Sequence, residues 1–277
     1  IDNVPVSRAP ANIDFDASAA EKGGFDHFML KEIFEQPDSI ANAIRGRLDE
    51  SAATARLQGI NLSPREMAEI NRIVVAACGT SLHAGLMGEY YFEDLAGIPT
   101  NVEQAAEFRY RNPIIEPETM VLAISQSGET ADTLAAVREA INKGAIVTSI
   151  CNVVGSTIAR ETGRGVYIHA GPEIGVASTK AFTCQVTVML MMALMFGRGR
   201  RLSREAGAAT IAEIARLPKL VKEVLARAPE IEALAKKYAK AHDFFFIGRG
   251  YLYPVAIEGA LKLKEISYIH AEGYHAA

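Results

Sequence analysis

Short, continuous apolar runs alternate with amphipathic stretches through the middle of the chain. The runs end at glycine or hydroxyl residues, as strands do, and cover residues 72–78, 119–125, 145–151 and 165–170. The stretches between them have helical periodicity and cover residues 81–95, residues 129–143 and a shorter segment from Ser156. Strands that are apolar at every position are buried on both faces. The pattern therefore predicts an α/β fold in which helices cover both faces of a parallel sheet.

Helical patterns lie on both sides of this region. Apolar residues at helical spacing begin at Phe25, Pro37 divides them into two helices, and a third helix ends near Asn71. The chain is again mostly helical over 180–242. Its longest apolar run, 188–196, is far shorter than the ~20 residues that a membrane-spanning helix needs. We interpret this run as part of a core helix.

Both ends of the chain are expected to be incomplete. Residues 1–24 contain two prolines and little periodicity, which is typical of a linker, so a further segment is expected before them. Near the other end, "DFFFIGRG" at 243–250 repeats the strand-then-glycine pattern and precedes a helix. The last residues, "HAEGYHAA", do not predict a partner strand for it. A second sheet is therefore expected to be truncated.

Composition narrows the classes of function. The chain has 277 residues, of which 49% are hydrophobic and 22% charged, which is enough for one large or two medium globular domains. A net charge of -4 makes nucleic acid or an anionic membrane a poor match as main partner, and favours a small molecule. The three cysteines lack a CxxC pattern, and no signal peptide opens the chain. These features predict reduced thiols in a cytoplasmic protein without a thiolate metal site.

Small polar residues gather where predicted strands end. The sequences are "CGTS" at 78–81, "SQSGET" at 125–130 and "GRG" at 248–250. In an open α/β sheet these ends meet the amino termini of helices, where free N–H groups favour an anion. Neither GxxxxGK[ST] nor GxGxxG occurs there, so ATP and dinucleotides are disfavoured. The alternative is that Ser127 or Thr130 only caps a helix. Two such loops in one sheet favour a binding site for a sugar phosphate or similar anion, by a modest margin, over simple helix capping.

Two further clusters have an ordinary structural explanation. The segment "PEIGVASTK" at 172–180 precedes the core helix, and Ser178 or Thr179 is expected to cap it. In "EGALKLKEISYIHAE", Lys262 and Glu265 lie three residues apart on one helical face. Such a pair could move a proton between adjacent carbons of a sugar, but spacing alone favours a simple intrahelical ion pair.

The motifs together resemble a known enzyme family. "CGTS", "AEFRYR", "SQSGETADTL", "ICNV", "EIGVASTKAFT" and "EGALKLKEISYIHAE" occur in the order found in the isomerase portion of glutamine:fructose-6-phosphate amidotransferases, the glucosamine-6-phosphate synthases. The resemblance implies SIS-type domains, each a three-layer αβα sandwich with a parallel sheet. It divides the chain into a linker (1–24), a helical lead-in with the first SIS domain (25–225), and the start of a second (226–277).

The resemblance also implies a function and a site. In that family the isomerase portion aminates fructose 6-phosphate and forms glucosamine 6-phosphate without a metal or organic cofactor, in amino-sugar synthesis. Ser125, Gln126, Ser127 and Thr130 would hold the phosphate, and Thr80, Ser81 and Val176 would contact the sugar. Glu265 would pass a proton between C2 and C1, with Lys262 beside it.

Several departures qualify this expectation. The family's ring-opening histidine lies in an "ELKHGP" motif that this sequence does not contain, and the tail with its imine-forming lysine is not in it either. The resemblance implies a glutaminase domain upstream and a homodimer in the intact enzyme. The chain alone is expected to be weakly active or inactive. The alternative function is a non-catalytic SIS domain that senses a phosphosugar, although "KLKEISYIHAE" favours the enzyme.

Overall fold

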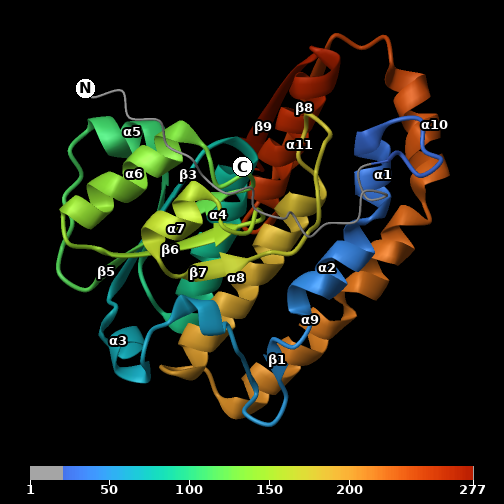
Figure 1. The fold of residues 1–277 in the computed structure, drawn as a ribbon. Helices are drawn as coiled ribbons and strands as arrows, with labels where there is room; N and C mark the ends of the chain where they lie inside the picture. The colour runs from blue at the N-terminus through green and yellow to red at the C-terminus, as the bar shows by residue number, and fades with distance from the viewer. Residues whose placement is uncertain (1–20, 277) are drawn as a thin grey trace, which may run out of the picture.

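A five-stranded parallel sheet forms the centre of the computed structural model, which describes residues 21–276 (Figure 1). Its strand order is β4-β3-β5-β6-β7, and every neighbouring pair is parallel. The bounds are β3 Arg72–Ala77, β4 Thr100–Gln104, β5 Thr119–Ser125, β6 Ile146–Cys151 and β7 Gly165–Tyr167. Strands β3, β5, β6 and β7 confirm the four strands that the apolar runs predicted. The edge strand β4 was missed because its polar, half-exposed sequence "TNVEQ" lacks such a run, and β7 ends three residues earlier than predicted.

Helices cover both faces of the sheet, as the continuous apolar pattern predicted. On one face, Ile73, Val75 and Leu122 pack against α4 (Gly79–Tyr91) and α8 (Lys180–Arg198). On the other face, Val74 and Val121 pack against α5 (Ala105–Tyr110), α6 (Ala131–Asn142) and α7 (Thr157–Thr162). Alternate residues of each strand therefore belong to two separate cores. These layers confirm the α/β sandwich.

The predicted core helix is α8. Val188, Met189, Met191 and Met192 are fully buried in it. Within residues 21–276, α8 alone is long and apolar enough to cross a membrane, but most of it is covered by the rest of the fold. Burial of this kind is typical of the central helix of a globular domain.

Further helices surround this core. The lead-in helices α1 (Phe28–Phe34) and α2 (Gln36–Ile44) lie beside α9 (Arg204–Leu225), and α10 (Ala228–Tyr238) follows α9 (Figure 1). Pro37 lies in the first turn of α2, which confirms the predicted division. The remaining short elements are β1 (Leu48–Asp49), β2 (Thr54–Ala55), a 3-10 turn (Gln58–Ile60), α3 (Pro64–Glu69) and a π-helical turn (Phe92–Ala96). Of the predicted linker, residues 1–20 lie outside the described part.

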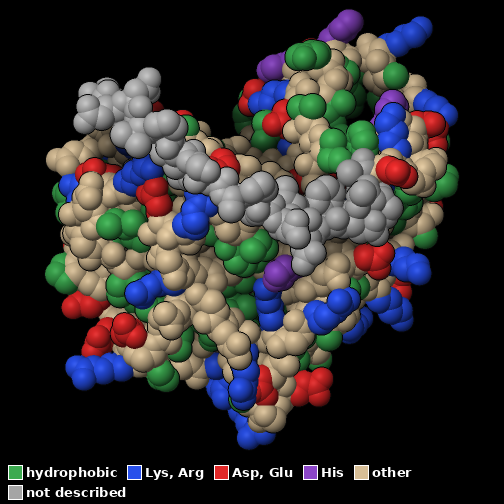
Figure 2. Space-filling view, viewed as in Figure 1, with side chains coloured by type: hydrophobic (Ala, Val, Ile, Leu, Met, Phe, Trp, Pro, Cys, Tyr) green, Lys and Arg blue, Asp and Glu red, His purple; other side chains and the backbone are tan. Residues whose placement is uncertain are grey.

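The C-terminal unit consists of β8 (Asp243–Gly248), α11 (Leu252–Ser267) and β9 (His270–His275). The expectation that β8 has no partner is wrong, because β9 pairs with it in parallel over all six residues. The polar sequence "HAEGYH" concealed this strand. Its Gly273 lies against α11, where a Cβ would be 2.5 Å from a side-chain atom of Ile257. Apolar side chains remain visible on this unit in Figure 2, and Phe245 and Ile247 are exposed there.

Candidate functional site

The two hydroxyl-rich loops lie side by side at the carboxyl edge of the sheet. One follows β3 and the other follows β5, and these strands are direct neighbours in parallel register. The chain passes from β3 outward to β4 and then back across β3 to β5. The strand order therefore reverses between β3 and β5. In open α/β sheets, ligands bind at such a switch point, outside the carboxyl ends of the strands.

Hydrogen bonds within the β5–α6 loop hold its hydroxyls in place. The buried Ser125 Oγ accepts from Gly128 N at 2.9 Å and lies 2.9 Å from Thr130 Oγ1. Ser127 Oγ accepts from Glu129 N at 3.1 Å. Gly128 has a φ of +67°, and a Cβ there would lie 2.0 Å from Ser156 Oγ. The loop thus needs glycine at this position both for its backbone conformation and for its packing.

Neither Ser127 nor Thr130 caps α6 through its side chain. Thr130 occupies the N-cap position, but its side chain makes no capping hydrogen bond and is paired with Ser125 instead. The first N–H groups of a helix have no acceptor within that helix. The capping alternative is therefore wrong for Thr130, and this helix end has the backbone donors and dipole that favour an anion.

Glu129, the one acidic residue of this loop, is directed away from it. Its carboxylate accepts from Thr157 N, at the start of α7, at 2.8 Å. This backbone hydrogen bond lowers the pKa of Glu129 below its usual value. The carboxylate is directed to the start of α7 and not to the start of α6. The negative charge of Glu129 is therefore compatible with an anion bound beside α6.

The first turn of α4, directly after β3, directs its two hydroxyls to different partners. Ser81 is buried, and its Oγ accepts from Gln185 Nε2 of α8 at 3.0 Å. Thr80 Oγ1 donates to Glu258 Oε1 at 2.9 Å and accepts from Lys262 Nζ at 2.8 Å. Thr80 thereby connects the switch point of the sheet to α11 in the C-terminal unit.

A cluster of charged groups on α11 contacts this turn of α4. Lys262 Nζ lies 2.6 Å from Glu265 Oε2 and 3.4 Å from Glu258 Oε1. His83 Nδ1 of α4 lies 2.7 Å from Glu258 Oε2. The side chain of Glu258 is 8% exposed, whereas that of Glu265 is 35% exposed. The predicted ion pair therefore exists, and Glu265 is the carboxylate that solvent can reach.

The contacts of Glu258 and His83 were not predicted from the sequence. Glu258 lies four residues before Lys262 and seven before Glu265, so spacing could have placed all three on one helical face. No comparable signal identified His83, because its contact with Glu258 spans 175 residues. The packing of α11 on α4, with Tyr251 against Tyr90 and Tyr91, produces that contact.

The loop between β7 and α8 contains the remaining predicted site residue, Val176, which is 96% exposed. The expected caps of α8 are wrong, because neither Ser178 nor Thr179 caps it through its side chain. Glu173 does so instead, accepting from Thr179 N at 2.8 Å, Ala181 N at 3.2 Å and Ser178 Oγ at 2.8 Å. The start of the loop is tied to the β5–α6 loop through Asn152, which bonds to Gln126 O, Ala170 N and Gly171 O.

Comparison with known proteins agrees with this architecture. The family model described as "SIS domain" matches residues 66–195 and 237–277. The chain belongs to the SIS domain family. Both matched stretches of this SIS protein contain parts of the switch-point site, since the first covers the two hydroxyl loops and the second covers α11.

The relatives assign the chain to one branch of that family. It is 53% identical, over its whole length, to glutamine–fructose-6-phosphate aminotransferase [isomerizing] of Chlorobaculum tepidum, and 52% identical over 273 residues to that of Thermus thermophilus. It spans 45% and 44% of these proteins, somewhat less than half of their length. The match corresponds to the C-terminal isomerase portion of the aminotransferases.

One solved structure gives the same assignment, and a second has the same fold. The C-terminal domain of glucosamine-fructose-6-phosphate aminotransferase from Francisella tularensis superposes with a TM-score of 0.87 at 39% identity, over 92% of this chain and 71% of that one. Tagatose-6-phosphate ketose/aldose isomerase from Escherichia coli is 16% identical with a TM-score of 0.64, covering 97% and 70% of the two chains. The second similarity concerns the fold alone.

Proposed function

We propose that this chain binds a sugar phosphate at the switch point between β3 and β5 and carries the isomerase chemistry of glucosamine 6-phosphate synthesis. One observation carries the proposal. The Lys262–Glu265 pair of α11 lies against Thr80, beside the loop whose hydroxyls and helix end suit an anion. The names of the aminotransferase relatives support the choice of fructose 6-phosphate and glucosamine 6-phosphate as ligands.

The residues of the β5–α6 loop would bind the phosphate. Ser127 can donate its hydroxyl hydrogen, and the Ser125–Thr130 pair has one hydroxyl hydrogen left after their mutual bond. Gln126 is the fourth proposed phosphate ligand. Thr80, Ser81 and Val176 would contact the sugar. The exposed position of Val176 and the location of Thr80 between the sheet and α11 are compatible with this role.

Glu265 is the proposed base. It would take a proton from one of two adjacent sugar carbons and return it to the other, while a second proton moves between the oxygen or nitrogen atoms bound to these two carbons, so that the product has the same charge and the same number of electrons as the substrate. Lys262, 2.6 Å away, would stabilise the carboxylate and the oxygen on which charge develops. This step uses side chains of the chain itself and no metal ligand or organic cofactor.

The relatives are about twice as long as this chain, so the complete reaction is part of the proposal. In the intact, cytoplasmic protein, an upstream glutaminase domain would supply ammonia and two chains would form a homodimer. The sequence lacks the motifs expected to supply ring opening and imine formation. For this reason we expect the 277 residues alone to bind the sugar phosphate but to interconvert aldose and ketose weakly or not at all.

Ligand-dependent melting tests the phosphate site. A ligand at one hundred times its dissociation constant stabilises the folded state by about 2.7 kcal/mol, which raises the melting temperature measurably. We expect fructose 6-phosphate and glucosamine 6-phosphate to produce this rise, and Ser127→Ala to reduce it. Ser51→Ala, in an exposed turn where Ser51 bonds Asp49, is the control. The assignment is wrong if neither sugar phosphate raises the melting temperature, or if Ser127→Ala responds like the parent.

Solvent hydrogen exchange tests the base. In D2O, a base acting on adjacent carbons introduces deuterium at C1 or C2 of the bound sugar phosphate, and NMR detects this even when net turnover is slow. We expect slow exchange that Glu265→Gln abolishes while ligand binding is retained. Exchange that persists in Glu265→Gln would exclude Glu265 as the base.

A further inference from the structure

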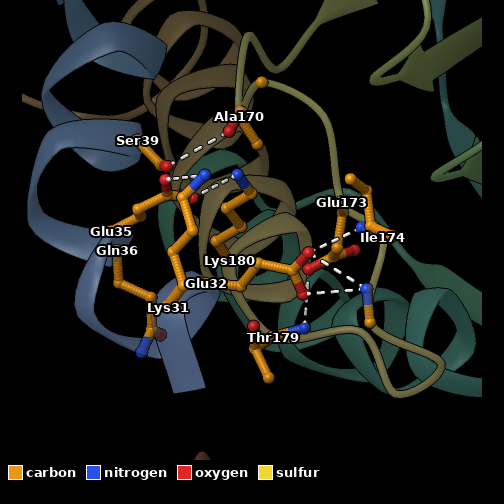
Figure 3. A network of polar contacts seen from close by, with 12 residues as sticks. Lys31, Glu32, Glu35, Gln36, Ser39, Ala170, Glu173, Ile174, Thr179 and Lys180 are labelled. Atoms are coloured by element: carbon orange, nitrogen blue, oxygen red, sulfur yellow. Dashed lines mark hydrogen bonds and ion pairs between the residues drawn. The ribbon is translucent and has the colours of Figure 1, made fainter. Parts of the chain in front are cut away.

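The lead-in helices contact the loop between β7 and α8 at three points (Figure 3). Ser39 Oγ donates to Ala170 O at 3.2 Å, near the start of the loop, and Lys180 Nζ donates to Glu35 Oε2 at 2.6 Å, directly after its end. Between them, Glu32 Oε1 accepts from Ile174 N at 2.5 Å and Gly175 N at 3.0 Å. Glu32, Glu35 and Ser39 are spaced by three and four residues. One face of the lead-in helices therefore follows the loop from its start to its end.

Glu32 is the most deeply buried carboxylate of this network, with 2% of the residue exposed. A buried charge is costly unless it is compensated by hydrogen bonds, and the two backbone N–H groups of the loop supply them. Gly175 permits this approach, because a Cβ there would lie 2.6 Å from Glu32 Oε2 and 3.3 Å from Met29 Cα. The absence of a side chain at Gly175 and the burial of Glu32 are thus two independent signs of one contact.

Two carboxylates together determine the shape of this loop. Glu173 binds the N–H groups at the start of α8, and Glu32 binds those of the next two loop residues, Ile174 and Gly175 (Figure 3). Ala177 is buried, whereas Val176 between these anchored segments is 96% exposed. Asn152 connects the beginning of the loop with Gln126 of the β5–α6 loop. The exposed tip therefore has a defined position relative to the proposed phosphate site.

We propose that Glu32 is a positioning residue for the ligand site. It belongs to the lead-in helix α1, outside the sheet, and acts on the ligand through the backbone at Ile174 and Gly175. The identity of that ligand rests on the proposed function. Without the Glu32 carboxylate, two partly buried N–H groups lose their acceptor, and the loop loses the contact that holds its tip beside the sugar.

The experiment uses Glu32→Ala, the conservative Glu32→Gln, and Ile40→Val as a control. Glu32→Gln keeps one oxygen that can accept from both N–H groups. Ile40→Val removes a methylene from a buried position of α2 that is not among the three loop contacts. Amide hydrogen exchange at Ile174 and Gly175 is measured on the unliganded protein, and the dissociation constant of fructose 6-phosphate is measured by calorimetry.

We expect Glu32→Ala to speed exchange at these two amides at least about tenfold and to weaken sugar phosphate binding about tenfold. Glu32→Gln should stay close to the parent in both readouts. Ile40→Val should lower the melting temperature without either effect, which separates positioning from general stability. Gly175→Ala should reproduce the exchange result, because its Cβ displaces Glu32.

The two readouts distinguish this inference from the function on which it rests. A parent protein that binds no sugar phosphate refutes the proposed function, while the exchange measurement on the unliganded chain still decides whether Glu32 holds the loop. Unchanged exchange at Ile174 and Gly175 in Glu32→Ala refutes the inference. Unchanged affinity in that variant, with a parent that binds, refutes it equally.

Discussion

The β5–α6 loop and the cluster on α11 contribute to one candidate site, but they are built differently. The loop is held by contacts between neighbours, such as Ser125 with Thr130 and with Gly128. The cluster depends on contacts across 178 and 182 residues, from Glu258 and Lys262 to Thr80. The loop is therefore a property of one strand–helix junction, whereas the cluster exists only while α11 is packed on α4.

The largest effect is expected at the centre of the α11 cluster. Glu258→Ala leaves Lys262 without one buried partner and removes the acceptor for Thr80 and His83. Breaking a buried pair in this way costs about 3–5 kcal/mol. Urea unfolding should show the loss, and sugar phosphate binding should weaken because Thr80 and Lys262 lose the carboxylate that both contact. Equal unfolding midpoints for Glu258→Ala and the parent would show that Glu258 does not stabilise the packing of α11 on α4.

A glycine substitution tests the β5–α6 loop with a smaller expected effect. Gly128→Ala places a side chain at a φ of +67° and against Ser156, 2.0 Å from its Oγ. Backbone strain and overpacking each contribute about 1–3 kcal/mol. The control is Gly144→Ala, whose φ is +81° but whose Cβ would meet nothing within 4 Å. Thermal melting should show Gly144→Ala losing only the strain. Similar losses in the two variants would mean that packing against Ser156 is unimportant.

The reactivities of Cys78 and Cys184 should differ because Cys78 lies at the switch point of the sheet and Cys184 lies in the core. Burial raises the pKa of Cys184 to about 12, so its thiolate is scarce at neutral pH. Cys78, directly after β3, is half-buried. We expect a thiol reagent to modify Cys78 at least about a hundredfold faster than Cys184, as resolved by peptide mass spectrometry. Added sugar phosphate should slow modification of Cys78 only. Protection that falls equally on both thiols would indicate a change in global stability instead.

The smallest expected effect is on the stability of the protein at acidic pH. The bond from Thr157 N lowers the pKa of Glu129 in the folded protein below the usual 4.5. A lowered folded pKa stabilises the protein above the unfolded value, and this contribution disappears as the pH falls through the folded value. Glu129→Gln should therefore melt slightly below the parent near pH 6, and the difference should shrink once the pH falls below 4.5 and through the lowered folded pKa. A constant difference across this range would show that the charge of Glu129 is irrelevant.

Apolar periodicity was sufficient for most of the fold. It predicted four of the five strands of the central sheet and the core helix α8, because burial on both faces requires continuous apolar residues. It failed for β4 and β9, which are polar and depend on backbone pairing with a neighbour rather than on their own side chains. Edge strands of this kind carry little signal in the sequence.

The candidate site also has features that the sequence predicted and features that it did not. Spacing alone identified the hydroxyls of the β5–α6 loop and the Lys262–Glu265 pair, because both rest on local geometry. It misjudged the cap of α8, and left a cap of α6 open as an alternative, since a hydroxyl at an N-cap position is one of several groups that can satisfy a helix end. Glu173 performs that task from six residues away from Thr179, and only the folded loop brings it there.

The sequence by itself determined the parallel α/β sheet, the chemistry of the strand ends and, through its motifs, membership of the SIS family. These properties depend on the order of apolar and polar residues over short stretches. Only the tertiary structure decided that Thr80 joins Lys262 to the sheet, that His83 meets Glu258, and that Glu32 holds Ile174 and Gly175. Each of these contacts joins residues more than a hundred positions apart, and their distances follow from helix packing, which no local pattern encodes.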